Sequence, residues 1–314
     1  MRRSVLSLAL LAIVLTCLHA VPAQAQPIRV FVALTGNDAN PCTFASPCKS
    51  AQHAHDVVAA GGEIRMLDPG SYGLLTITKA ISILGEGHGG IAAQNGAVAI
   101  TINAGASDKI HLRGLVIEGF GSGLLGIRFN TGASLSVQDC VVRNFFNTGV
   151  VFAPTGSSQL FVIDTRVERN GSDGISIIPP SSGTISGTID HVASVNNQGA
   201  GFDHGHTVGT ATSDFAIGNS VMSNNQFGIA VSGLANGTST TSAVTVWNSA
   251  VNNNQFDGLH AGGANTTLRV TKSNITRNGT GFSTLSGGTI ISFGDNSVDG
   301  NTTNGAPTST IVLH

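Results

Sequence analysis

The chain brings Asp203, His204 and His206 together within four residues and has a further histidine at His260. An aspartate beside several histidines can bind a metal ion or transfer protons in general acid–base catalysis. If Phe202 lies on a strand and points into the protein core, the alternation of side chains places Asp203 outward and His204 inward. A solvated turn around the intervening glycine is the alternative interpretation. We treat these residues as candidate catalytic residues: Asp203, His204, His206 and His260.

These side chains belong to a repeat that recurs roughly every 23–30 residues from residue 110 onward. Each copy has an alternating apolar strand, a polar corner, a second short strand, an Asn-rich turn and a glycine followed by an apolar residue. Such units predict the coils of a parallel β-helix. Leucine-rich repeats would need regular leucine spacing and a helix, and β-propellers need longer units with more aromatic residues. The copies begin at Ile110, Leu135, Leu160, Ile185, Phe215, Val244, Leu268 and Ile290.

Successive coils of such a fold stack about 4.8 Å apart, so equivalent residues form columns along the axis. We expect aliphatic columns inside, glycine at one corner and a ladder of asparagine side chains at another. The chain contains 41 Gly and 24 Asn, which agrees with a turn-dense all-β protein. The predicted ladder consists of Asn144, Asn170, Asn196, Asn225, Asn254, Asn278 and Asn301.

The third strand of each coil gives a column of outward residues that contains both Asp203 and His260. These two residues should lie two coils apart, with about 9–10 Å between their backbones. Asp190 and His191 lie one strand earlier in the coil of Asp203 and complete the list of candidate catalytic residues. The predicted outward column is Arg128, Val151, Ser176, Asp203, Ala230, His260 and Ser283.

Residues 26–109 predict the N-terminal cap and first coils of the β-helix, and residues 110–314 the repeated coils of the same domain. A helix over Ser50–Ala60, N-capped by Ser50 and ended by the two glycines that follow, would cover the apolar end of the solenoid. We expect roughly ten coils in all. Strands are expected at residues 63–67, 74–78, 81–84 and 98–103, with a closing strand at 311–313.

Residues 1–25 have two arginines, a short apolar stretch and an Ala-x-Ala sequence that ends at Ala25. This is the pattern of a secretory signal peptide, and the apolar stretch is short for a membrane span. The chain has 15 Lys+Arg, two of them in this segment, against 17 Asp+Glu, with no basic cluster. A nucleic-acid partner is therefore not expected. We expect a secreted monomer with no membrane span, extracellular or periplasmic.

The expected mature chain keeps three cysteines. Cys42 and Cys48 lie in a turn-rich loop, and in an oxidising compartment a local disulfide is the natural interpretation. Two cysteines without a nearby histidine in the sequence pattern make a poor zinc site. Cys140 lies in an apolar stretch and is expected to be a buried free thiol rather than a nucleophile.

The N-terminal stretch 31–43 resembles the opening of many secreted right-handed parallel β-helix proteins. It reads as a strand followed by a G-x-D-x-N-P turn, and the helix and Asp68-Pro69-Gly70-Ser71-Tyr72 continue the pattern. With the repeats, the resemblance to the pectate-lyase-like superfamily covers nearly the whole mature chain. It implies an all-β, right-handed parallel β-helix. That superfamily includes lyases, hydrolases, esterases, epimerases and adhesins, so the fold alone leaves the function open.

A pectate-lyase-type site would need acidic side chains that hold Ca²⁺ and an arginine or lysine as base. Arg143, Arg166 and Arg169 are available near the corner that follows the first strand. The preferred interpretation is that acids and amides at this corner bond the turn backbone, because the column runs through every coil. Calcium is expected only if the chain is a lyase. The corner column is Asp139, Asp164, Asp190, Asn219, Asn248 and Asp295.

Hydrolases of the polygalacturonase type carry a different set of motifs, which includes paired aspartates and Gly-His-Gly. The chain has no Asp-Asp pair, and its Gly87-His88-Gly89 lies upstream of every candidate acid. Two functions are therefore carried forward. The favoured one is a non-catalytic, secreted β-helix that binds a polysaccharide or cell-envelope glycan. The alternative is a polysaccharide lyase or glycoside hydrolase that acts on an acidic glycan.

Overall fold

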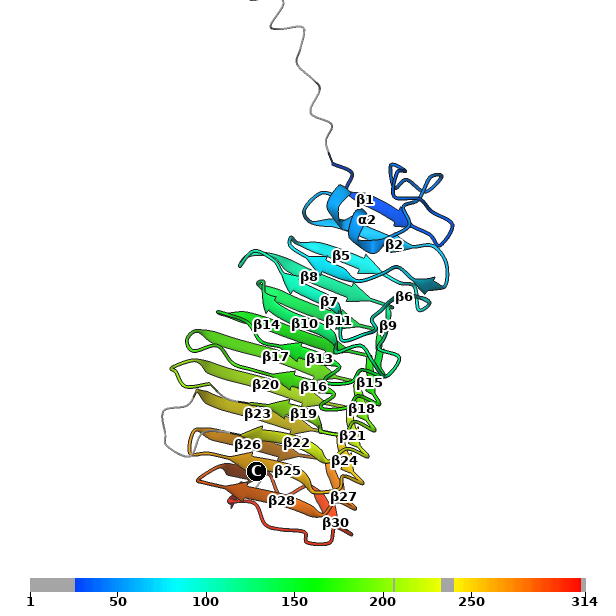
Figure 1. Cartoon of the computed structure of the whole chain (residues 1–314). Coiled ribbons are helices and arrows are strands. Elements are labelled where there is room, and N and C mark those ends of the chain that lie inside the picture. Colours follow the sequence, from blue (N-terminus) through cyan, green and yellow to red (C-terminus); the bar gives the residue numbers. More distant parts are fainter. Residues whose placement is uncertain (1–25, 206, 233–239, 312–314) are drawn as a thin grey trace, which may run out of the picture.

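The computed structural model describes residues 26–205, 207–232 and 240–311, which form a right-handed parallel β-helix (Figure 1). The expected signal peptide, residues 1–25, lies outside these ranges. The chain passes through three parallel sheets in turn, and each strand pairs with the equivalent strands of neighbouring coils. The predicted fold class is confirmed. Within the described ranges nine successive coils supply a strand to all three sheets, slightly fewer than the expected ten.

The first sheet has 12 strands and contains the long alternating strand of each coil. Alternate residues point inward, so that Phe215, Ile217, Val244 and Val246 of two neighbouring strands are all fully buried. The register of neighbouring strands therefore stacks aliphatic or aromatic side chains of successive coils over one another. In spatial order the strands are β1 (Arg29–Val32), β2 (Gly62–Met66), β5 (Ile81–Leu84), β8 (Lys109–Arg113), β11 (Ser134–Gln138), β14 (Ser158–Ile163), β17 (Thr184–Asp190), β20 (Thr212–Gly218), β23 (Thr241–Trp247), β26 (Thr266–Thr271), β29 (Thr289–Ser292) and β31 (Ser309–Thr310).

The second sheet has ten strands, most of them three residues long. The middle residue of each short strand points inward, as Val142, Val167 and Met222 do, and these side chains are fully buried. The strands are β3 (Gly70–Ser71), β6 (Gly89–Ala92), β9 (Val116–Glu118), β12 (Val141–Arg143), β15 (Arg166–Glu168), β18 (Ala193–Val195), β21 (Val221–Ser223), β24 (Ala250–Asn252), β27 (Asn274–Thr276) and β30 (Ser297–Asp299).

The third sheet has nine strands, and most of these begin at or beside the repeated glycine. We expected this glycine to form a corner, but at Gly174 the reason is space, because a Cβ there would lie 2.0 Å from Ser194 Oγ. The strands are β4 (Leu75–Ile77), β7 (Val98–Asn103), β10 (Leu125–Thr131), β13 (Val150–Phe152), β16 (Ile175–Ile177), β19 (Ala200–His204), β22 (Phe227–Ser232), β25 (Asp257–Gly262) and β28 (Thr280–Leu285).

A ladder of buried asparagines fastens the turns between the second and third sheets. The side-chain oxygen of Asn254 accepts the Asn225 N–H at 3.1 Å, and its Nδ2 donates to the Met222 carbonyl at 3.0 Å. The same Nδ2 donates to Asn278 Oδ1 at 2.9 Å. Each amide thus satisfies buried backbone groups of neighbouring coils. The ladder consists of Asn170, Asn197, Asn225, Asn254, Asn278 and Asn301.

Two members of the predicted ladder were wrong by one residue. Asn144 and Asn196 both have φ 58° and take the left-handed position that comes immediately before the ladder. The ladder position itself is occupied by Asn197 in one coil and by Phe145 in the other, whose N–H donates to Asn170 Oδ1 at 3.1 Å. Asparagine suits both positions, because it tolerates left-handed backbone and also bonds across coils, so its presence in a turn does not fix the register.

The N-terminal end is covered by the short helix α2 (Ala51–Val57), as predicted. The Ser50 side chain accepts the His53 N–H at 3.1 Å, which confirms Ser50 as N-cap. The helix ends three residues earlier than expected, because Val58 is extended (ψ 147°) and fully buried. The next N–H, that of Ala59, donates to the Pro27 carbonyl at 2.9 Å. In the part of the chain that the structure describes, no helix is long and apolar enough to cross a membrane.

The predicted strand bounds hold with small shifts. β5 and β7 begin and end as expected, whereas β2 lies one residue earlier and β4 is one residue shorter at each end. The closing strand is β31 at Ser309–Thr310, before the expected 311–313, and the final residues from 312 lie outside the described ranges.

Cys42 and Cys48 form the expected disulfide, and Cys140 is a buried free thiol with its pKa raised by burial to about 12.

We predict that Asn254→Ala lowers the free energy of unfolding by about 2–4 kcal/mol, because it leaves the Asn225 N–H and the Met222 carbonyl unpaired in the core. Urea denaturation followed by circular dichroism measures this change. Gln255→Ala, at the exposed position that follows in the same turn, should cost less than about 0.5 kcal/mol. Equal losses in the two variants would contradict the ladder's role.

Candidate functional site

The outward column of the third sheet is confirmed by the strand register. Ser176 pairs with Asp203, Asp203 with Ala230, and Ala230 with His260. Asp203 and His260 therefore lie two coils apart in one column, close to 10 Å at the usual strand spacing of about 4.8 Å. His204, the next residue after Asp203, points inward as predicted and is fully buried.

Asp203 and His260 line one groove of about 450 Å³, which we call the Asp203 pocket. It lies between the outer face of the third sheet and the turns that lead into it. Amide, hydroxyl and carboxyl groups form most of its wall, and Phe227 adds a ring. The remaining lining residues are Gly171, Ser172, Asp173, Gln198, Gly199, Ala200, Gln226, Ala230 and Ser232.

Two carboxyl groups approach each other in the Asp203 pocket. Burial and then the charge of Asp173 raise the pKa of Asp203, a hydrogen bond from Ser176 opposes both effects, and the resulting pKa is about 7. Burial also raises the pKa of Asp173. The hydrogen bond that Asp173 Oδ1 accepts from the Ala200 N–H at 2.8 Å acts in the opposite direction and lowers this pKa, but burial prevails. Asp203 is thus a carboxyl group that holds a proton close to neutral pH, as general acids do.

His260 is held by a second carboxylate at the other end of the pocket. Its Nδ1 lies 2.9 Å from Asp257 Oδ2 and 3.3 Å from Ser283 Oγ. Burial raises the pKa of Asp257, but hydrogen bonds from His260 and Ser283 outweigh it and leave the pKa below its usual value. An ionised Asp257 fixes the orientation of the imidazole, which is the way carboxylates commonly position catalytic histidines.

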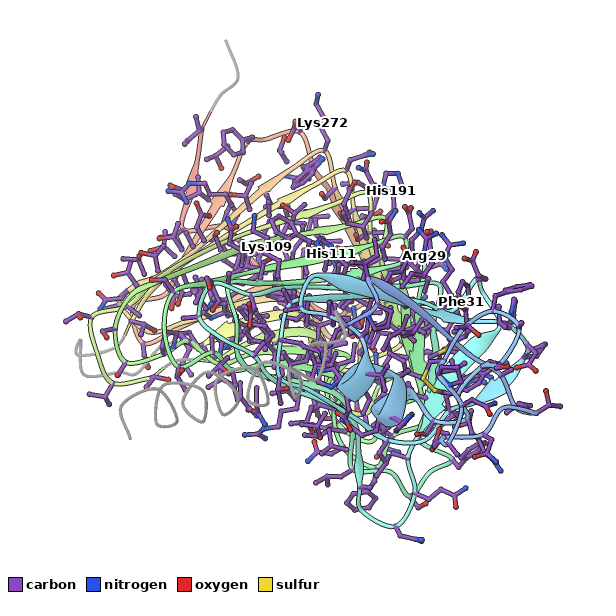
Figure 2. All side chains as sticks on the ribbon, turned by 90° about the horizontal axis from the view of Figure 1, so that it is seen from above. Arg29, Phe31, Lys109, His111, His191 and Lys272 are labelled. Atoms are coloured by element: carbon purple, nitrogen blue, oxygen red, sulfur yellow. A yellow bond between two sulfur atoms is a disulfide. The ribbon has the colours of Figure 1, made fainter. Side chains whose placement is uncertain are left out.

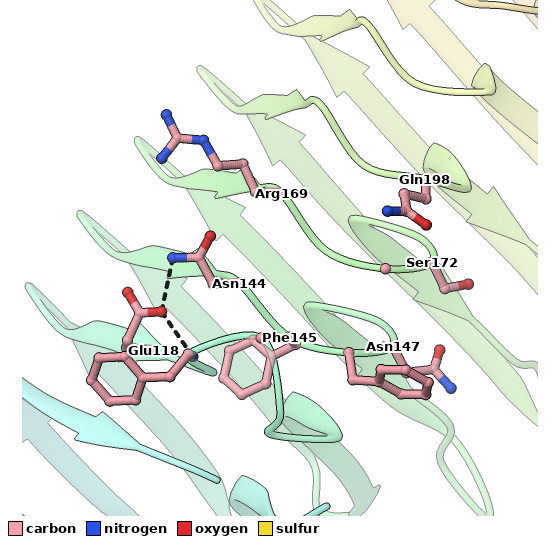
Figure 3. A pocket seen from close by; sticks show the side chains of 11 residues that line it. Glu118, Asn144, Phe145, Asn147, Arg169, Ser172 and Gln198 are labelled. Atoms are coloured by element: carbon pink, nitrogen blue, oxygen red, sulfur yellow. Dashed lines mark hydrogen bonds between the residues drawn. The ribbon is translucent and has the colours of Figure 1, made fainter.

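A larger groove of about 850 Å³ adjoins the Asp203 pocket and is drawn in Figure 3. We call it the Glu118 pocket. Glu118 Oε1 accepts bonds from Asn144 Nδ2 at 2.8 Å and from the Phe120 N–H at 3.0 Å, and Arg143 Nε donates to its other oxygen at 2.7 Å. Burial raises the pKa of Glu118, but these bonds outweigh it and hold the pKa below its usual range. Arg169 lines the same pocket.

The two pockets form one continuous groove along the turns, because Gly171, Ser172 and Gln198 line both. Two phenylalanines of successive coils, Phe120 and Phe146, stand in the wall of the Glu118 pocket with 60% and 68% of their surface exposed. Exposed rings in a groove rimmed by polar groups are typical of a ligand-binding surface.

The structure does not bring His204 to this groove. Its Nε2 lies 2.6 Å from Ser213 Oγ inside the coil, and its ring packs edge-on against Phe215 at 5.9 Å between ring centres. It reaches no solvent. His206, another candidate, lies outside the described residues.

Asp190 and His191 lie at a different corner, between the first and second sheets. His191 Nδ1 lies 3.0 Å from Asp190 Oδ2, and its ring stands on the outer surface in the view of Figure 2. Asn219 Nδ2 donates to Asp190 Oδ1 at 2.8 Å, so this carboxylate bonds the next coil. The two residues form a pair of their own and do not line the Asp203 or the Glu118 pocket.

The corner column assigned to Asp190 needs correction. In the register Asp190 pairs with Ile163 and Gly218, one position before the corner, and His191 takes the corner itself with φ 53°. Asp295 also falls outside the set of left-handed corner residues. Backbone geometry thus explains the acids and amides there. The corner residues are Asp139, Asp164, His191, Asn219, Asn248 and Lys272.

These acids do not fit a calcium centre. Ca²⁺ takes six to eight oxygen ligands, usually with several carboxylates among them. In the described ranges, one group of three Asp, Glu, His or Cys side chains brings its ligand atoms within 4.8 Å, and it contains no carboxylate. Arg166, a candidate base, is paired with Glu168 at 2.7 Å. The chemistry of the groove is therefore derived from its side chains alone.

Sequence reasoning found Asp203 and His260 but missed Asp173, Asp257 and Glu118. Asp173 and Asp257 share a signal that was available, since each stands directly before the repeated glycine that opens a third strand. Glu118 closes a second strand, and only the fold brings it beside Arg143 and Asn144 of the next coil.

Neither protein-family models nor curated protein sequences match this chain. Solved structures do match. A pectate lyase, Pel9A, is 17% identical, with a TM-score of 0.66 over 90% of this chain and 79% of its own. The A-module of the mannuronan C-5 epimerase AlgE4 from Azotobacter vinelandii is 15% identical, with a TM-score of 0.56 over 78% of each chain. At these identities the likeness establishes a shared fold.

We predict that Asp203 makes stability depend on pH. Between about pH 4 and 7 the folded protein keeps a proton that the unfolded chain releases, so the free energy of unfolding falls as pH rises and levels off above about 7. Asp203→Asn removes this dependence. Between pH 4 and 7 the free energy of unfolding of the variant should therefore rise relative to that of the wild type by up to about 4 kcal/mol. Urea denaturation at several pH values measures it. Asp214→Asn, on the exposed face of β20, should leave the wild-type slope unchanged.

Proposed function

We propose that this protein, which has the fold of pectate-lyase-like β-helices, binds a polysaccharide along the groove formed by the Glu118 and Asp203 pockets. The observation that carries the proposal is the groove itself, which runs parallel to the coil axis and is open over several coils. A chain of linked sugars is long and narrow, so a groove of this shape can contact several units at once. The solved structures with this fold include a pectate lyase and a mannuronan epimerase, whose named substrates are polysaccharides.

The chemistry of the wall supports a sugar ligand. Gln198, Gln226 and Asn147 offer amides that donate and accept hydrogen bonds, which matches the mixed donors and acceptors of sugar hydroxyls. Phe120 and Phe146 lie in successive coils and offer exposed rings on which the apolar face of a sugar can stack. The arrangement thus combines weak directional bonds with apolar contact.

The charges of the groove favour a neutral glycan at the Asp203 pocket. Asp173 and Asp203 already disfavour a second negative charge there, as the raised pKa of both groups shows. No lysine or arginine lines this pocket among the described residues. In the adjoining Glu118 pocket Arg169 is part of the wall, and Arg143 beside it is paired with Glu118. The carboxylate of an acidic sugar would meet repulsion at this point. The proposed ligand therefore differs from the acidic glycan of the alternative function that the sequence left open.

Hydrolysis of the bound glycan is the second candidate function, and the raised pKa of Asp203 favours it. Asp203 would donate its proton to the glycosidic oxygen as the bond to the anomeric carbon breaks. His260, oriented by Asp257, would take a proton from the water that attacks that carbon. Inverting glycosidases separate acid and base by about 6.5–9.5 Å to admit a water, and the backbones of Asp203 and His260 are spaced at close to 10 Å.

We predict that Phe146→Ala weakens binding to neutral polysaccharides about tenfold, because it removes one stacking surface from the Glu118 pocket. Affinity electrophoresis against a panel of neutral and acidic glycans measures this. Phe44→Ala is the matched control, since Phe44 is 70% exposed and lies in the N-terminal loop away from the groove. If the two variants bind alike, the groove is not the binding surface.

We predict that Asp203→Asn lowers the rate at which reducing ends are released from a neutral glycan at least a hundredfold, because the amide cannot donate the proton. Binding of the glycan should be retained. The wild-type rate should fall as pH rises above about 7, where Asp203 loses its proton. Asp214→Asn is the control and should keep the wild-type rate. Absorbance of unsaturated uronates, with Ca²⁺ added, tests the lyase alternative in parallel. Binding without any product would exclude hydrolysis and leave the non-catalytic function.

A further inference from the structure

The N-terminal cap, blue in Figure 1, contains a second chemical constellation outside the residues that line the groove. Cys42 Sγ, Cys48 Sγ and a ring nitrogen of His53 all lie within 4.8 Å of one another. The sulfurs come from the loop after β1 and the imidazole from the first turn of α2. The spacing of the cysteines predicts no zinc site, but the helix turns His53 toward the two sulfurs.

We propose that reduction of the Cys42–Cys48 disulfide converts this constellation into a binding site for Zn²⁺, with Cys42, Cys48 and His53 as the protein ligands. Two thiolates and an imidazole are among the ligand sets that zinc prefers in proteins. While the disulfide is intact, its sulfurs are bonded to each other and offer no thiolate. The cap would therefore be closed by a covalent bond under oxidising conditions and by a metal under reducing ones.

The backbone that carries the ligands is fastened independently of the disulfide. The Cys42 carbonyl accepts the Phe31 N–H at 2.9 Å, and the Cys48 N–H donates to the Phe31 carbonyl at 3.0 Å. Both cysteines are thus tied to the same residue of β1. Breaking the S–S bond leaves these contacts in place, so the two sulfurs stay close enough to share a metal.

Asp38 fixes the third ligand and adds charge. Its carboxylate accepts the Lys49 and Ser50 N–H groups at 2.8 and 2.9 Å and the Ser50 hydroxyl at 2.8 Å, which holds the start of α2 against the loop. The same carboxylate interacts electrostatically with His53. A negative charge beside the site favours a bound cation.

The chemistry balances with a dithiol as reductant. The dithiol gives two electrons and two protons to the disulfide, becomes a cyclic disulfide itself, and leaves Cys42 and Cys48 as thiols. Zn²⁺ then displaces one proton from each thiol. Cys140 does not compete for the metal, because it is buried in the fourth coil and its pKa is raised to about 12.

Co²⁺ is a suitable probe, because thiolate ligation gives it sulfur-to-metal charge-transfer bands. We predict that the full chain, reduced with a phosphine, binds one Co²⁺ and shows these bands. Zn²⁺ should displace the Co²⁺, and the oxidised chain should show no such bands. His53→Gln should weaken the metal at least tenfold and keep the fold of the oxidised protein, since its ring is partly exposed. His111→Gln, on the exposed face of β8, is the matched control and should bind as the wild type does.

Three results would overturn the proposal. These are absence of the charge-transfer bands in the reduced, folded chain, equal affinity of the His53→Gln and His111→Gln variants, and the same bands in the oxidised chain. Circular dichroism of the reduced protein, with and without Zn²⁺, adds a second measurement. Zinc should raise its melting temperature, and no rise at saturating metal would also count against the site.

Discussion

The hydrogen bonding of each coil to the next, in register apart from one shift between β7 and β10, is the constraint on which the rest of the structure depends. All three sheets repeat it, and the asparagine ladder repeats it within the turns. Because the spacing is fixed at about 4.8 Å, a residue's place in its coil decides which residues it can meet. Asp203 and His260 share a groove for this reason, although 56 positions separate them in sequence.

This constraint explains how far the sequence could be read. The outward column of the third strand was predicted correctly, because a glycine followed by a buried apolar residue marks the register in most coils. The corner and ladder columns were each placed one residue wrong in some coils. Asparagine, aspartate and histidine can all adopt left-handed backbone, as Asn196 and His191 do, so residue type alone does not separate neighbouring positions in a turn.

The site was harder to predict than the fold, because its properties come from burial that no local pattern encodes. The sequence marked Asp203 as an outward aspartate close to histidines, but it did not predict the raised pKa. Its proton affinity depends on Asp173 in the preceding coil and on the turns that shield both groups from water. His204 stands directly after it and is a core residue, so adjacency in sequence says little about shared chemistry in a strand.

The two ends of the stack differ in a way that gives the molecule a direction. At one end α2 and a covalent link cover the first coil, whereas the other finishes in β31, a strand of two residues. A solenoid loses order one coil at a time, since each coil contacts only its neighbours. Opening should therefore start at the C-terminal end and travel toward the cap. The groove reaches His260 in the eighth coil, whose imidazole meets Ser283 of the ninth. Opening of the last full coil therefore already loosens this end of the groove, while the Glu118 pocket lies deeper in the stack.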